Sequence, residues 1–327
     1  MKEKDIRDKD KLKLYLKLVQ EDCKAFLNSK KALVKVKCPA CQEDKHILEF
    51  KKSCFEYVTC LNCSTLYAKT RLSFDSLKEF YGRSASTDFW VKEFFMPVAE
   101  ARREKIFRPR AEFITEYFGK DPAWQIGDIG AGFGLFLDEL HKLWGQSSYI
   151  AIEPSLEQAE LCGKLDLKAE CSTLEELKGY DNSFNLLTAF ELFEHLYDPS
   201  VFLSSVYRLL KKGGWLFLTT LNGEGFDIRI LWEDSKAIYP PCHINFFNPG
   251  SIRHLLTREG FEAVKIETPG QLDWDIVEGA IVNDSIKLGK FWETFARKGK
   301  SEAKDELQDW IRRNNLSSHM RVLARKK

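Results

Sequence analysis

Between residues 120 and 270, short apolar runs alternate with stretches whose apolar residues recur at helical spacing. Each run is long enough for a buried strand, and glycine, proline or polar clusters separate the runs. Strands that alternate with helices in this way predict a parallel sheet covered by helices on both faces. The strands of this fold are expected at residues 124–129, 149–153, 167–173, 184–190, 215–222, 261–266 and 319–325.

The N-terminal segment has a different pattern. Residues 1–33 begin with a mixed-charge run and then carry apolar side chains at helical spacing, which predicts a helix packed on a neighbouring element. Its lysines also allow a helix that lies on a membrane surface, but the acids Glu21 and Asp22 weaken that alternative.

Four cysteines follow in two Cys-x-x-Cys pairs, which are Cys38 with Cys41 and Cys60 with Cys63. Two such pairs at this separation present four thiolates tetrahedrally, which suits Zn²⁺. The residues between the pairs supply short strands, so residues 34–70 are predicted to form a zinc ribbon. Four thiolates fill the coordination sphere, and the metal is therefore expected to stabilise a small domain rather than to catalyse a reaction. Cys54 lies outside both pairs and is expected to be buried.

Residues 71–119 are predicted to connect the ribbon to the sheet. The segment 64–98 is dense in aromatic residues, which favours packing between domains; a lid over a substrate pocket is the alternative. Residues 99–119 have the spacing of an amphipathic helix. Its basic residues are expected to form a solvated face, with phosphate binding as the alternative, and they are Arg102, Arg103, Lys105, Arg108 and Arg110.

Composition narrows the class of protein. The 327 residues suffice for one large domain with a small one, or for two domains, and 44% of them are hydrophobic. No apolar run approaches the length of a membrane span and no N-terminal pattern resembles a secretory signal, so a soluble protein is expected. Nine cysteines without such a signal favour reducing surroundings and a cytoplasmic location. A formal net charge of +1 gives no support for a nucleic-acid partner.

The candidate chemistry begins where the first predicted strand ends, in a glycine-rich turn with the spacing Asp128-x-Gly130-x-Gly132-x-Gly134. Glycines adopt positive φ and let a ligand approach the backbone, and the turn leads into a helix N-terminus at the carboxyl edge of the predicted sheet. The dinucleotide-binding pattern requires a third glycine where this chain has Leu135. The spacing instead resembles motif I of the class I S-adenosylmethionine (SAM) dependent methyltransferases.

Three later motifs strengthen this resemblance. They are Glu191-x-x-Glu194-His195-x-x-Asp198-Pro199 after the fourth strand, Leu209-x-Lys211-x-Gly213-Gly214 before the fifth, and Thr220-x-Asn222 at the end of the fifth. Before the fifth strand, the two glycines are expected to stop the preceding helix. Together the motifs resemble the small-molecule methyltransferases of the ubiquinone-pathway type over residues 120–270. The resemblance implies a doubly wound, seven-stranded class I methyltransferase (Rossmann-like) α/β domain at residues 120–327, preceded by the small zinc-ribbon domain.

The same resemblance implies which residues bind SAM, and these are Asp128, Gly130, Gly132, Gly134, Glu153, Ser172, Thr173, Phe190 and Glu191. The three glycines would border the methionine part of SAM. Glu153 ends the second strand, where a carboxylate can accept hydrogen bonds from both ribose hydroxyls. Ser172 and Thr173 would lie near the adenine, and Phe190 and Glu191 would line the pocket beside the sulfonium.

Two histidines are candidates for proton transfer, because the pKa of histidine lies close to neutral pH. His195 follows the fourth strand, where the family pattern favours helix-start architecture and packing beside the cofactor over a role as base. His243 lies in a segment that resembles the His-x-x-Phe-Phe segment of sugar-modifying methyltransferases. There it would act as a base or as a hydrogen-bond partner of the substrate; a histidine that pins the loop is the alternative.

A zinc ribbon before a SAM domain is also the domain order of the deoxysugar C-methyltransferases. This chain departs from them at Pro240-Pro241-Cys242, where those enzymes carry a Tyr/Glu-rich stretch. In the class I superfamily a short turn joins the last two strands, whereas here a helical insertion at about 270–318 separates them. The insertion is expected to shape the acceptor pocket, with core packing or a dimer face as the alternative.

The resulting hypothesis is a SAM-dependent methyltransferase with structural Zn²⁺ that acts on a small molecule, most simply a nucleotide-linked or glycan-pathway sugar as in polysaccharide biosynthesis. One alternative is a methyltransferase of RNA or protein that docks through the lysines of the ribbon, against which the neutral overall charge argues. Another is a non-catalytic partner subunit, against which the intact glycine turn argues. No nucleic-acid or membrane partner is expected, and the pattern indicates neither an oligomeric state nor whether O, N or C is methylated.

Overall fold

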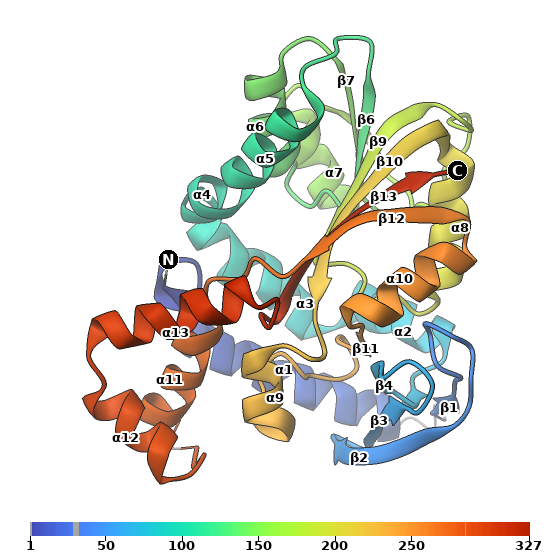
Figure 1. Cartoon of the computed structure of the whole chain (residues 1–327). Helices are drawn as coiled ribbons and strands as arrows, with labels where there is room; N and C mark the ends of the chain where they lie inside the picture. The colour runs from blue at the N-terminus through green and yellow to red at the C-terminus, as the bar shows by residue number, and fades with distance from the viewer. Residues whose placement is uncertain (1, 29–32, 285) are drawn as a thin grey trace. The chain divides into compact units, whose positions relative to one another are not determined.

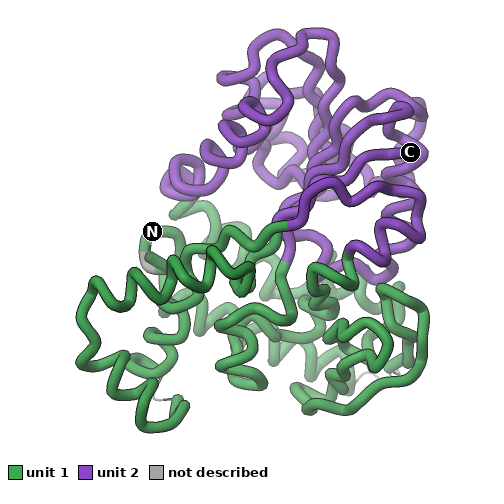
Figure 2. Tube along the Cα trace, viewed as in Figure 1, with its two compact units in different colours: residues 1–98, 221–252, 267–320 green, residues 99–220, 253–266, 321–327 purple. Residues whose placement is uncertain are grey.

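The computed structural model describes residues 2–28, 33–284 and 286–327. The chain divides into two compact units, each made of three separate stretches (Figure 2). Unit 1 comprises residues 1–98, 221–252 and 267–320, and unit 2 comprises residues 99–220, 253–266 and 321–327. The helix expected at 1–33 belongs to unit 1, and its residues 1 and 29–32 lie outside the described part of the chain.

Unit 2 is built on a sheet of seven strands, which are β6 (Gln125–Ile129), β7 (Ser148–Ile152), β8 (Lys168–Glu170), β9 (Phe184–Phe190), β10 (Leu210–Leu221), β12 (Phe261–Glu267) and β13 (His319–Lys326). Their order, β12-β13-β10-β9-β6-β7-β8, confirms the predicted seven-stranded, doubly wound fold (Figure 1). β6 is parallel to both β7 and β9, and the pairs β7–β8 and β9–β10 are also parallel. The strand order therefore reverses at β6, and sheets of this type bind ligands beyond the carboxyl end of the strand where that happens.

Helices cover both faces of this sheet (Figure 1). On one side lie α5 (Arg108–Phe118), α6 (Leu135–Trp144) and α7 (Leu156–Gly163), and on the other lies α8 (Pro199–Leu209). The main apolar core of unit 2 forms where α5 and α6 meet the strands, around Ile114, Phe136, Leu140 and Leu186. α10 (Pro249–Arg258) begins in unit 1 and ends in unit 2.

The amphipathic helix expected at 99–119 is a continuous helical stretch with a π-helical turn inside it: α4 (Ala99–Arg102), η4 (Arg103–Phe107) and α5. The prediction that its basic residues form a solvated face is wrong for Arg103 and Arg110, whose side chains are only 12% and 14% exposed. Arg103 pairs with the carboxylates of Asp138 and Glu139, on α6. These partners lie on another helix, so no spacing within 99–119 indicates that the arginines turn inward.

Unit 1 contains a second sheet, whose strands are β2 (His46–Lys52), β3 (Phe55–Cys60), β4 (Leu66–Ala68) and β11 (Asn245–Phe246). Their order is β11-β4-β3-β2, and all neighbouring strands are antiparallel. β11 comes from the segment that carries His243, so this segment completes the sheet of the cysteine-rich region. A separate two-stranded ladder joins β1 (Val34–Lys35) to β5 (Thr70–Arg71).

The remaining elements of unit 1 are helical: η1 (Glu3–Asp5), α1 (Lys9–Asn28), α2 (Phe74–Arg83), α3 (Ala85–Phe89), η2 (Trp90–Phe95), η3 (Met96–Val98), α9 (Phe226–Leu231), η5 (Trp232–Asp234), α11 (Asp273–Asn283), α12 (Lys290–Lys298) and α13 (Ser301–Arg313). Aromatic residues of 64–98 pack on α1, where the Trp90 ring lies 4.8 Å from the Tyr15 ring. α9, α11 and α12 share an apolar core around Leu231, Trp274 and Ala296. Among the described helices, none combines the length and apolar content that a membrane crossing requires.

Candidate functional site

The glycine-rich turn begins where β6 ends and leads into α6. Gly130, Gly132 and Gly134 have φ of +69°, +56° and +71°, a conformation that residues with a Cβ rarely adopt. A Cβ on Gly134 would lie 2.9 Å from Leu167 and 3.1 Å from Cys162, so close packing also requires this glycine. Around Gly130 and Gly132 the nearest atoms are farther away, at 3.8 and 3.4 Å. A Cβ would therefore fit at these two positions without a clash, and the positive φ alone favours glycine there.

Asp128, the acid that precedes the first glycine, is buried beneath this turn. Its Oδ1 accepts a hydrogen bond of 2.6 Å from Thr188 Oγ1 on the neighbouring strand β9. Burial raises the pKa of Asp128 to about 7, although the bond from Thr188 opposes the shift. The carboxyl group thus joins the two central strands directly below the turn, and it is poised to hold or release a proton near neutral pH.

Glu153 follows β7 and is directed at the glycine turn rather than at solvent, with only 7% of the residue exposed. Its Oε2 accepts a hydrogen bond of 2.9 Å from the Gly132 amide, and Oε1 accepts one of 2.9 Å from the Ser155 amide. Burial raises the pKa of Glu153, while the two amide bonds oppose that shift. A carboxylate oxygen has more than one lone pair, so each can accept a further hydrogen bond from a ligand hydroxyl.

The loop after β8 carries Ser172 and Thr173. The backbone amide of Ser172 donates to the Glu170 carbonyl at 3.0 Å. The Ser172 hydroxyl, in contrast, is buried and has no hydrogen-bond partner among the described residues. A buried hydroxyl without a partner is destabilising unless a ligand or water satisfies it. This hydroxyl is therefore available to a polar group of a ligand or to a water beside the loop.

A network of polar contacts surrounds the end of β9. Glu191 has a φ of +49°, unusual for a residue other than glycine. Its Oε1 accepts hydrogen bonds of 2.7 Å from both Arg110 Nη2 and Thr219 Oγ1. The Arg110 guanidinium also lies over the Phe190 ring, 4.6 Å from its centroid. The network fixes the strained turn and buries a positive charge next to it.

Arg110 is the residue of this site that the sequence pattern did not reveal. In the sequence it is one of five basic residues in a single helix, and nothing distinguishes it from the others. In the fold, burial lowers its pKa while Glu191 opposes the shift. A buried guanidinium beside the end of β9 is suited to bind a carboxylate, because its planar donors match the two carboxylate oxygens.

Glu194 and His195 follow in the turn that leads to α8. Glu194 is 1% exposed, and its Oε2 accepts a hydrogen bond of 2.9 Å from Thr220 Oγ1. Burial, together with the charge of Glu191, raises the pKa of Glu194 to about 8. His195 is half-buried and its amide donates to the Leu192 carbonyl at 3.0 Å. This backbone bond belongs to the turn that starts the helix.

The four paired cysteines come together in unit 1, with their sulfur atoms all within 4.8 Å of one another. Cys38 Sγ lies 3.5 Å from Cys63 Sγ, and Cys41 Sγ lies 3.5 Å from Cys60 Sγ. Zn–S bonds of about 2.3 Å in a tetrahedron require sulfur separations of roughly 3.7 Å, so the four thiols fit a zinc ion. Cys54 is exposed, which contradicts the expectation of a buried thiol.

His243 belongs to unit 1, between η5 and β11. Its Nδ1 lies 2.7 Å from the Ala237 carbonyl oxygen, and Nδ1 donates this hydrogen bond because a carbonyl oxygen can only accept. The Tyr57 hydroxyl, from β3, donates to the His243 carbonyl at 2.8 Å. The His243 ring also lies 4.0 Å from the Tyr239 ring. The backbone and the ring are therefore both held by the surrounding unit.

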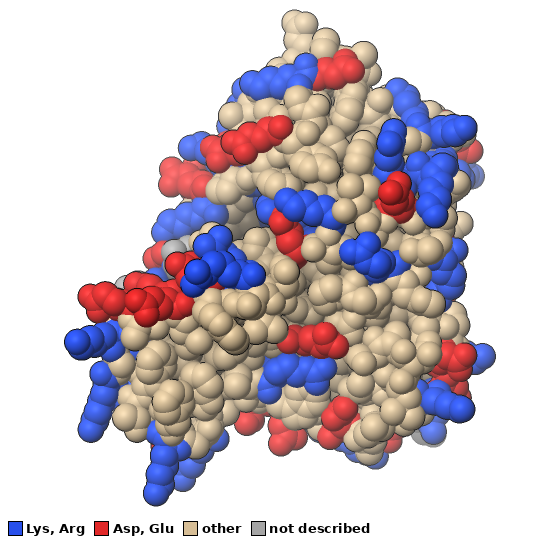
Figure 3. All heavy atoms as spheres, in the orientation of Figure 1, with Lys and Arg blue, Asp and Glu red and all other residues tan. Residues whose placement is uncertain are grey.

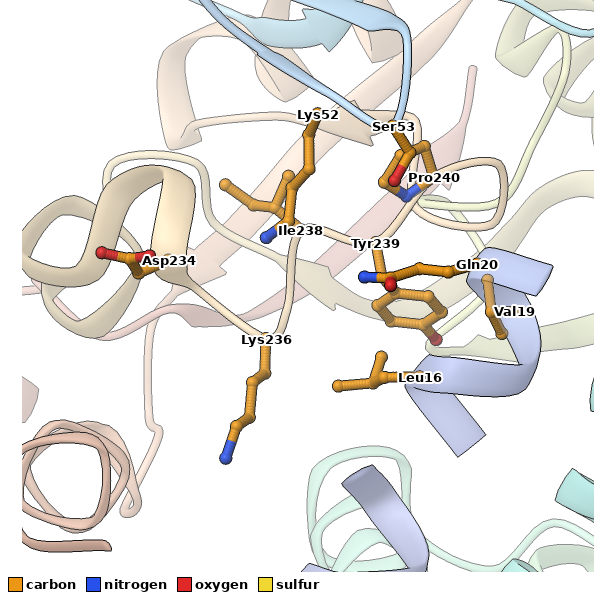
Figure 4. A pocket seen from close by; sticks show the side chains of 10 residues that line it. All are labelled: Leu16, Val19, Gln20, Lys52, Ser53, Asp234, Lys236, Ile238, Tyr239 and Pro240. Carbon is orange, nitrogen blue, oxygen red and sulfur yellow. The ribbon is translucent and has the colours of Figure 1, made fainter. Parts of the chain in front are cut away.

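A cavity of about 190 Å³ opens beside this segment, with walls from α1, the turn after β2 and the residues that follow η5 (Figure 4). Tyr239 contributes an aromatic ring, while Gln20, Ser53 and Asp234 contribute an amide, a hydroxyl and a carboxylate. Lys52 donates to two backbone carbonyls, at 2.7 and 3.0 Å, and burial lowers its pKa to about 8. An aromatic ring among hydrogen-bonding groups suits a small polar ligand with one apolar face.

The predicted residues are divided between the two units. The residues expected to bind a cofactor all lie in unit 2, at the carboxyl ends of β6, β7, β8 and β9, which form one edge of the parallel sheet. His195 lies in unit 2 as well. The four cysteines and His243 lie in unit 1, together with the helical insertion and the cavity.

Comparisons with known proteins agree with this architecture. Residues 98–266, just over half of the chain, match the family described as a methyltransferase domain. Ubiquinone biosynthesis O-methyltransferase from Xanthomonas oryzae is 35% identical over 100 residues, which are 29% of this chain and 42% of that protein. tRNA U34 carboxymethyltransferase from Wolinella succinogenes is 26% identical over 193 residues, 54% of this chain and 64% of that protein. The chain thus spans about half the length of the curated relatives it matches.

A solved structure supports the fold. The complex of the Haloferax volcanii Trm112 methyltransferase activator with a methyltransferase contains a chain that superposes with a TM-score of 0.51 at 14% identity, over 73% of this chain and 96% of that one. The strand order, the glycine turn and the family match all indicate the same kind of domain. The chain belongs to the methyltransferase domain family, and it has the fold of the class I SAM-dependent methyltransferases.

Proposed function

We propose that unit 2 binds SAM above Gly132 and that the protein transfers the methyl group of SAM to a small-molecule acceptor. The contact between the Glu153 carboxylate and the Gly132 amide carries this proposal. It places an acid from the end of the second strand of the sheet against the glycine turn. Lone pairs remain on that acid for the two hydroxyls of a ribose.

Other groups in unit 2 fit the remaining parts of this cofactor. The Ser172 hydroxyl, buried without a partner among the described residues, is available to a nitrogen of the adenine. The Arg110 guanidinium suits the carboxylate of the methionine part, and the Glu191 carboxylate favours a nearby positive charge. Bound there, SAM would supply a methyl group that its positive sulfur activates for nucleophilic attack.

The protein itself has to align the acceptor, exclude water and remove one proton from the acceptor. We propose that Nε2 of His243 accepts the proton of the acceptor, because Nδ1 already donates its hydrogen to the Ala237 carbonyl. That carbonyl would also stabilise the imidazolium that forms when Nε2 accepts the proton. His195 is the second candidate base, although its position in the turn before α8 favours a role in the architecture of that turn.

We infer that unit 1 recognises the acceptor and that the acceptor is a sugar, either linked to a nucleotide or part of a glycan pathway. The cavity next to the His243 segment supports this inference. The ring of Tyr239 offers a face for the C–H groups of a sugar, and Gln20, Ser53 and Asp234 offer partners for its hydroxyls (Figure 4).

We also propose that the four cysteines hold Zn²⁺ in a closed, structural site. The metal would supply a crosslink between the two turns that flank β2 and β3. β4 follows the second turn and pairs with β11, and Tyr57 of β3 bonds to the His243 carbonyl. An ordered ribbon would therefore also fix the backbone of the His243 segment. The metal itself would take no part in methyl transfer.

A second candidate function is methylation of RNA. The similarity to a tRNA carboxymethyltransferase covers more of this chain than the similarity to the ubiquinone-pathway relatives. The ribbon also carries Lys35, Lys37, Lys45 and Lys51, all of them exposed. Lysines on such a surface would contact phosphates, and the affinity would then depend steeply on salt.

Calorimetry and methyl transfer test the main proposal. The protein should take up SAM and S-adenosylhomocysteine, and Glu153→Ala should lose most of that affinity while remaining folded. With labelled SAM, the label should then move into a member of a panel of nucleotide sugars, and not into tRNA. Absence of SAM binding would refute the proposal, and labelled tRNA would establish the second candidate.

Matched variants test the acceptor cavity. Asp234→Asn changes a carboxylate in the cavity wall, whereas Glu233→Gln changes its neighbour, which does not line the cavity. Asp234→Asn should raise the KM for the acceptor several-fold and leave the Kd for SAM unchanged, and Glu233→Gln should behave as wild type. If the two variants had the same KM for the acceptor, the acceptor would not bind in this cavity.

A further inference from the structure

The helix α12, in the insertion of unit 1, presents an exposed aromatic side chain among positive charges. Phe291 is 70% exposed, more than any other large apolar side chain that the structure describes. Five basic residues surround it in the sequence, and all five are exposed: Lys287, Lys290, Arg297, Lys298 and Lys300. We refer to Phe291 and these five residues as the basic tip. Figure 3 shows Lys and Arg side chains over α12, below the Asp and Glu side chains of α13.

The pattern of exposure separates the two faces of this helix. Lys290, Phe291, Thr294, Arg297 and Lys298 are exposed and recur at helical spacing, so they share one face. On the opposite side, Ala296 is buried and packs in the core formed with α9 and α11, with Trp292 and Phe295 half-buried beside it. The Phe291 ring contacts Trp292 and Phe295 of its own helix, with centroids 5.1 and 6.1 Å away, yet most of its surface stays exposed.

The contacts within the fold do not account for the basic tip. None of its five cations makes an ion pair of 4 Å or less with another described residue. Lys287 and Lys290 stand at the start of α12, where the helix dipole disfavours positive charge. Phe291 leaves most of its surface in water, although burial would stabilise it. Arg297 and Lys298 lie in the last turn, where the dipole favours them, so the fold accounts for their charge but not for Lys287, Lys290 or the exposed ring of Phe291.

We propose that the basic tip docks the protein onto an anionic phospholipid bilayer. Lysine and arginine close to such a surface are attracted to the acidic headgroups, and each raises membrane affinity by roughly five-fold. A phenyl ring on the same face can enter the boundary between headgroups and acyl chains, as in other amphipathic helices that lie in the interface. The helix would thus lie on the membrane without crossing it.

A bilayer fits this surface better than a nucleic acid does. α13 directly follows α12 and exposes the acids Glu302, Asp305, Glu306 and Asp309. A polyanion that tracked along both helices would meet this negative charge, whereas a planar membrane can contact α12 alone. The net charge of +1 also provides no general attraction for nucleic acid.

The proposal differs from the expectation that the protein has no membrane partner. That expectation depended on the absence of a long apolar run and on the acids of the N-terminal helix. The sequence of α12 does not show that Phe291 remains outside the core, because Trp292 and Phe295 of the same helix are packed inside. Only the fold distinguishes the exposed ring of Phe291 from the half-buried rings of Trp292 and Phe295.

Co-sedimentation with vesicles tests the proposal. The protein should sediment with vesicles of phosphatidylcholine and phosphatidylserine, and remain in solution with vesicles of phosphatidylcholine alone. The bound fraction should fall as salt concentration rises. Neutralising three cations of one face, in Lys290→Gln/Arg297→Gln/Lys298→Gln, should weaken binding on the order of 100-fold. Phe291→Ser, made in the wild-type protein, should also weaken vesicle binding, and the remaining binding should still depend on phosphatidylserine.

A matched variant distinguishes docking through the basic tip from a general attraction of surface cations to the acidic membrane. Lys164→Gln/Lys178→Gln/Lys212→Gln removes three exposed cations of unit 2 and should bind vesicles as wild type does. Circular dichroism and the unfolding midpoint verify that each variant remains folded. Equal loss of binding in both triple variants would overturn the proposal. So would a wild-type protein that stays in solution with both kinds of vesicle, or one that binds single-stranded RNA through the basic tip and no vesicle.

Discussion

At the scale of single residues, the carboxyl groups buried in unit 2 couple protons to folding. Burial raises the pKa of Asp128 to about 7 and that of Glu194 to about 8. In the unfolded chain the same groups would titrate near pH 4. The folded state therefore binds protons more tightly than the unfolded state between about pH 4 and pH 8, and the free energy of unfolding should fall as pH rises through that range.

Glu194→Gln tests this coupling. The stabilisation that Glu194 contributes is fully present below its unfolded pKa and is lost as pH rises through about 8. The amide cannot ionise and can still accept the bond from Thr220, so the variant should lose less stability than wild type between pH 5 and pH 8.5, by at least ~1 kcal/mol. Urea unfolding at the two pH values measures the difference. Identical pH dependence in variant and wild type would contradict it, and exposed Glu175→Gln serves as the control.

His243→Ala tests the proposed base. If Nε2 takes the proton of the acceptor, the variant should lose about 10²–10⁴-fold in kcat while the Kd for SAM stays within a factor of two. Steady-state kinetics and calorimetry measure the two quantities separately. A collapse of SAM binding with normal turnover per bound SAM would instead make His243 an anchor of its loop, consistent with its bond to Ala237.

The sequence could indicate those candidate site residues whose positions in the fold follow from where a strand ends. Asp128 and Glu153 could be predicted because parallel strands end at the same edge of a sheet. Arg110 could not be predicted, because its burial depends on the partner Glu191, far along the chain. The same holds for the bond between Glu194 and Thr220, which joins two strand ends through side chains alone.

At the scale of elements, the turn between β6 and α6 combines two separate requirements for glycine. Gly130 and Gly134 both have positive φ, but only Gly134 also lacks space for a Cβ, which would lie 2.9 Å from Leu167. Gly130→Ala should therefore destabilise unit 2 by about 1–2 kcal/mol through backbone strain. Gly134→Ala should cost a further 1–3 kcal/mol or so through overpacking. Urea unfolding without ligand provides both values, and equal costs would contradict the packing argument.

The periodicity of the sequence located most strands of unit 2, because strands buried on both faces appear as continuous apolar runs. Periodicity did not predict strands whose partners are distant in the sequence or whose pairing is irregular. Gly213 and Gly214 were expected to stop a helix, but α8 ends at Leu209 and both glycines lie in β10, at an irregularity of its pairing with β9. The pairing of β11 with β4 joins distant segments, and no local pattern encodes such a pair.

At the scale of the molecule, a metal in the ribbon should stabilise unit 1. We expect one Zn²⁺ per chain, and loss of the metal in Cys60→Ser. Removing the metal should increase hydrogen exchange in β2, β3 and β4, because the metal would crosslink the two turns that flank β2 and β3. Metal analysis and exchange measured by mass spectrometry test this. Cys54→Ser alters an exposed thiol outside the cluster and should retain the metal; equal metal loss in both variants would contradict the assignment.

Composition and motifs indicated a methyltransferase fold with a cysteine-rich addition, and that much of the molecule could be predicted. They did not indicate that residues 221–252 and 267–320 fold with the N-terminal region in unit 1. The reason is physical: which unit a segment joins depends on the apolar surfaces it meets, and those are presented by remote parts of the chain. One example is the apolar core in which α9 and α11, two segments distant in the sequence, pack together.

The position of β13 has a consequence for biosynthesis. This strand lies between β10 and β12 in the sheet, yet it is the last of the seven to leave the ribosome. A nascent chain that stops short of residue 319 has every other strand but a gap in the interior of the sheet, which exposes the unpaired edges of two neighbours. The pairing of this sheet can therefore be completed only after residues 319–326 have been synthesised, and chaperones that bind unfinished sheets would act before that point.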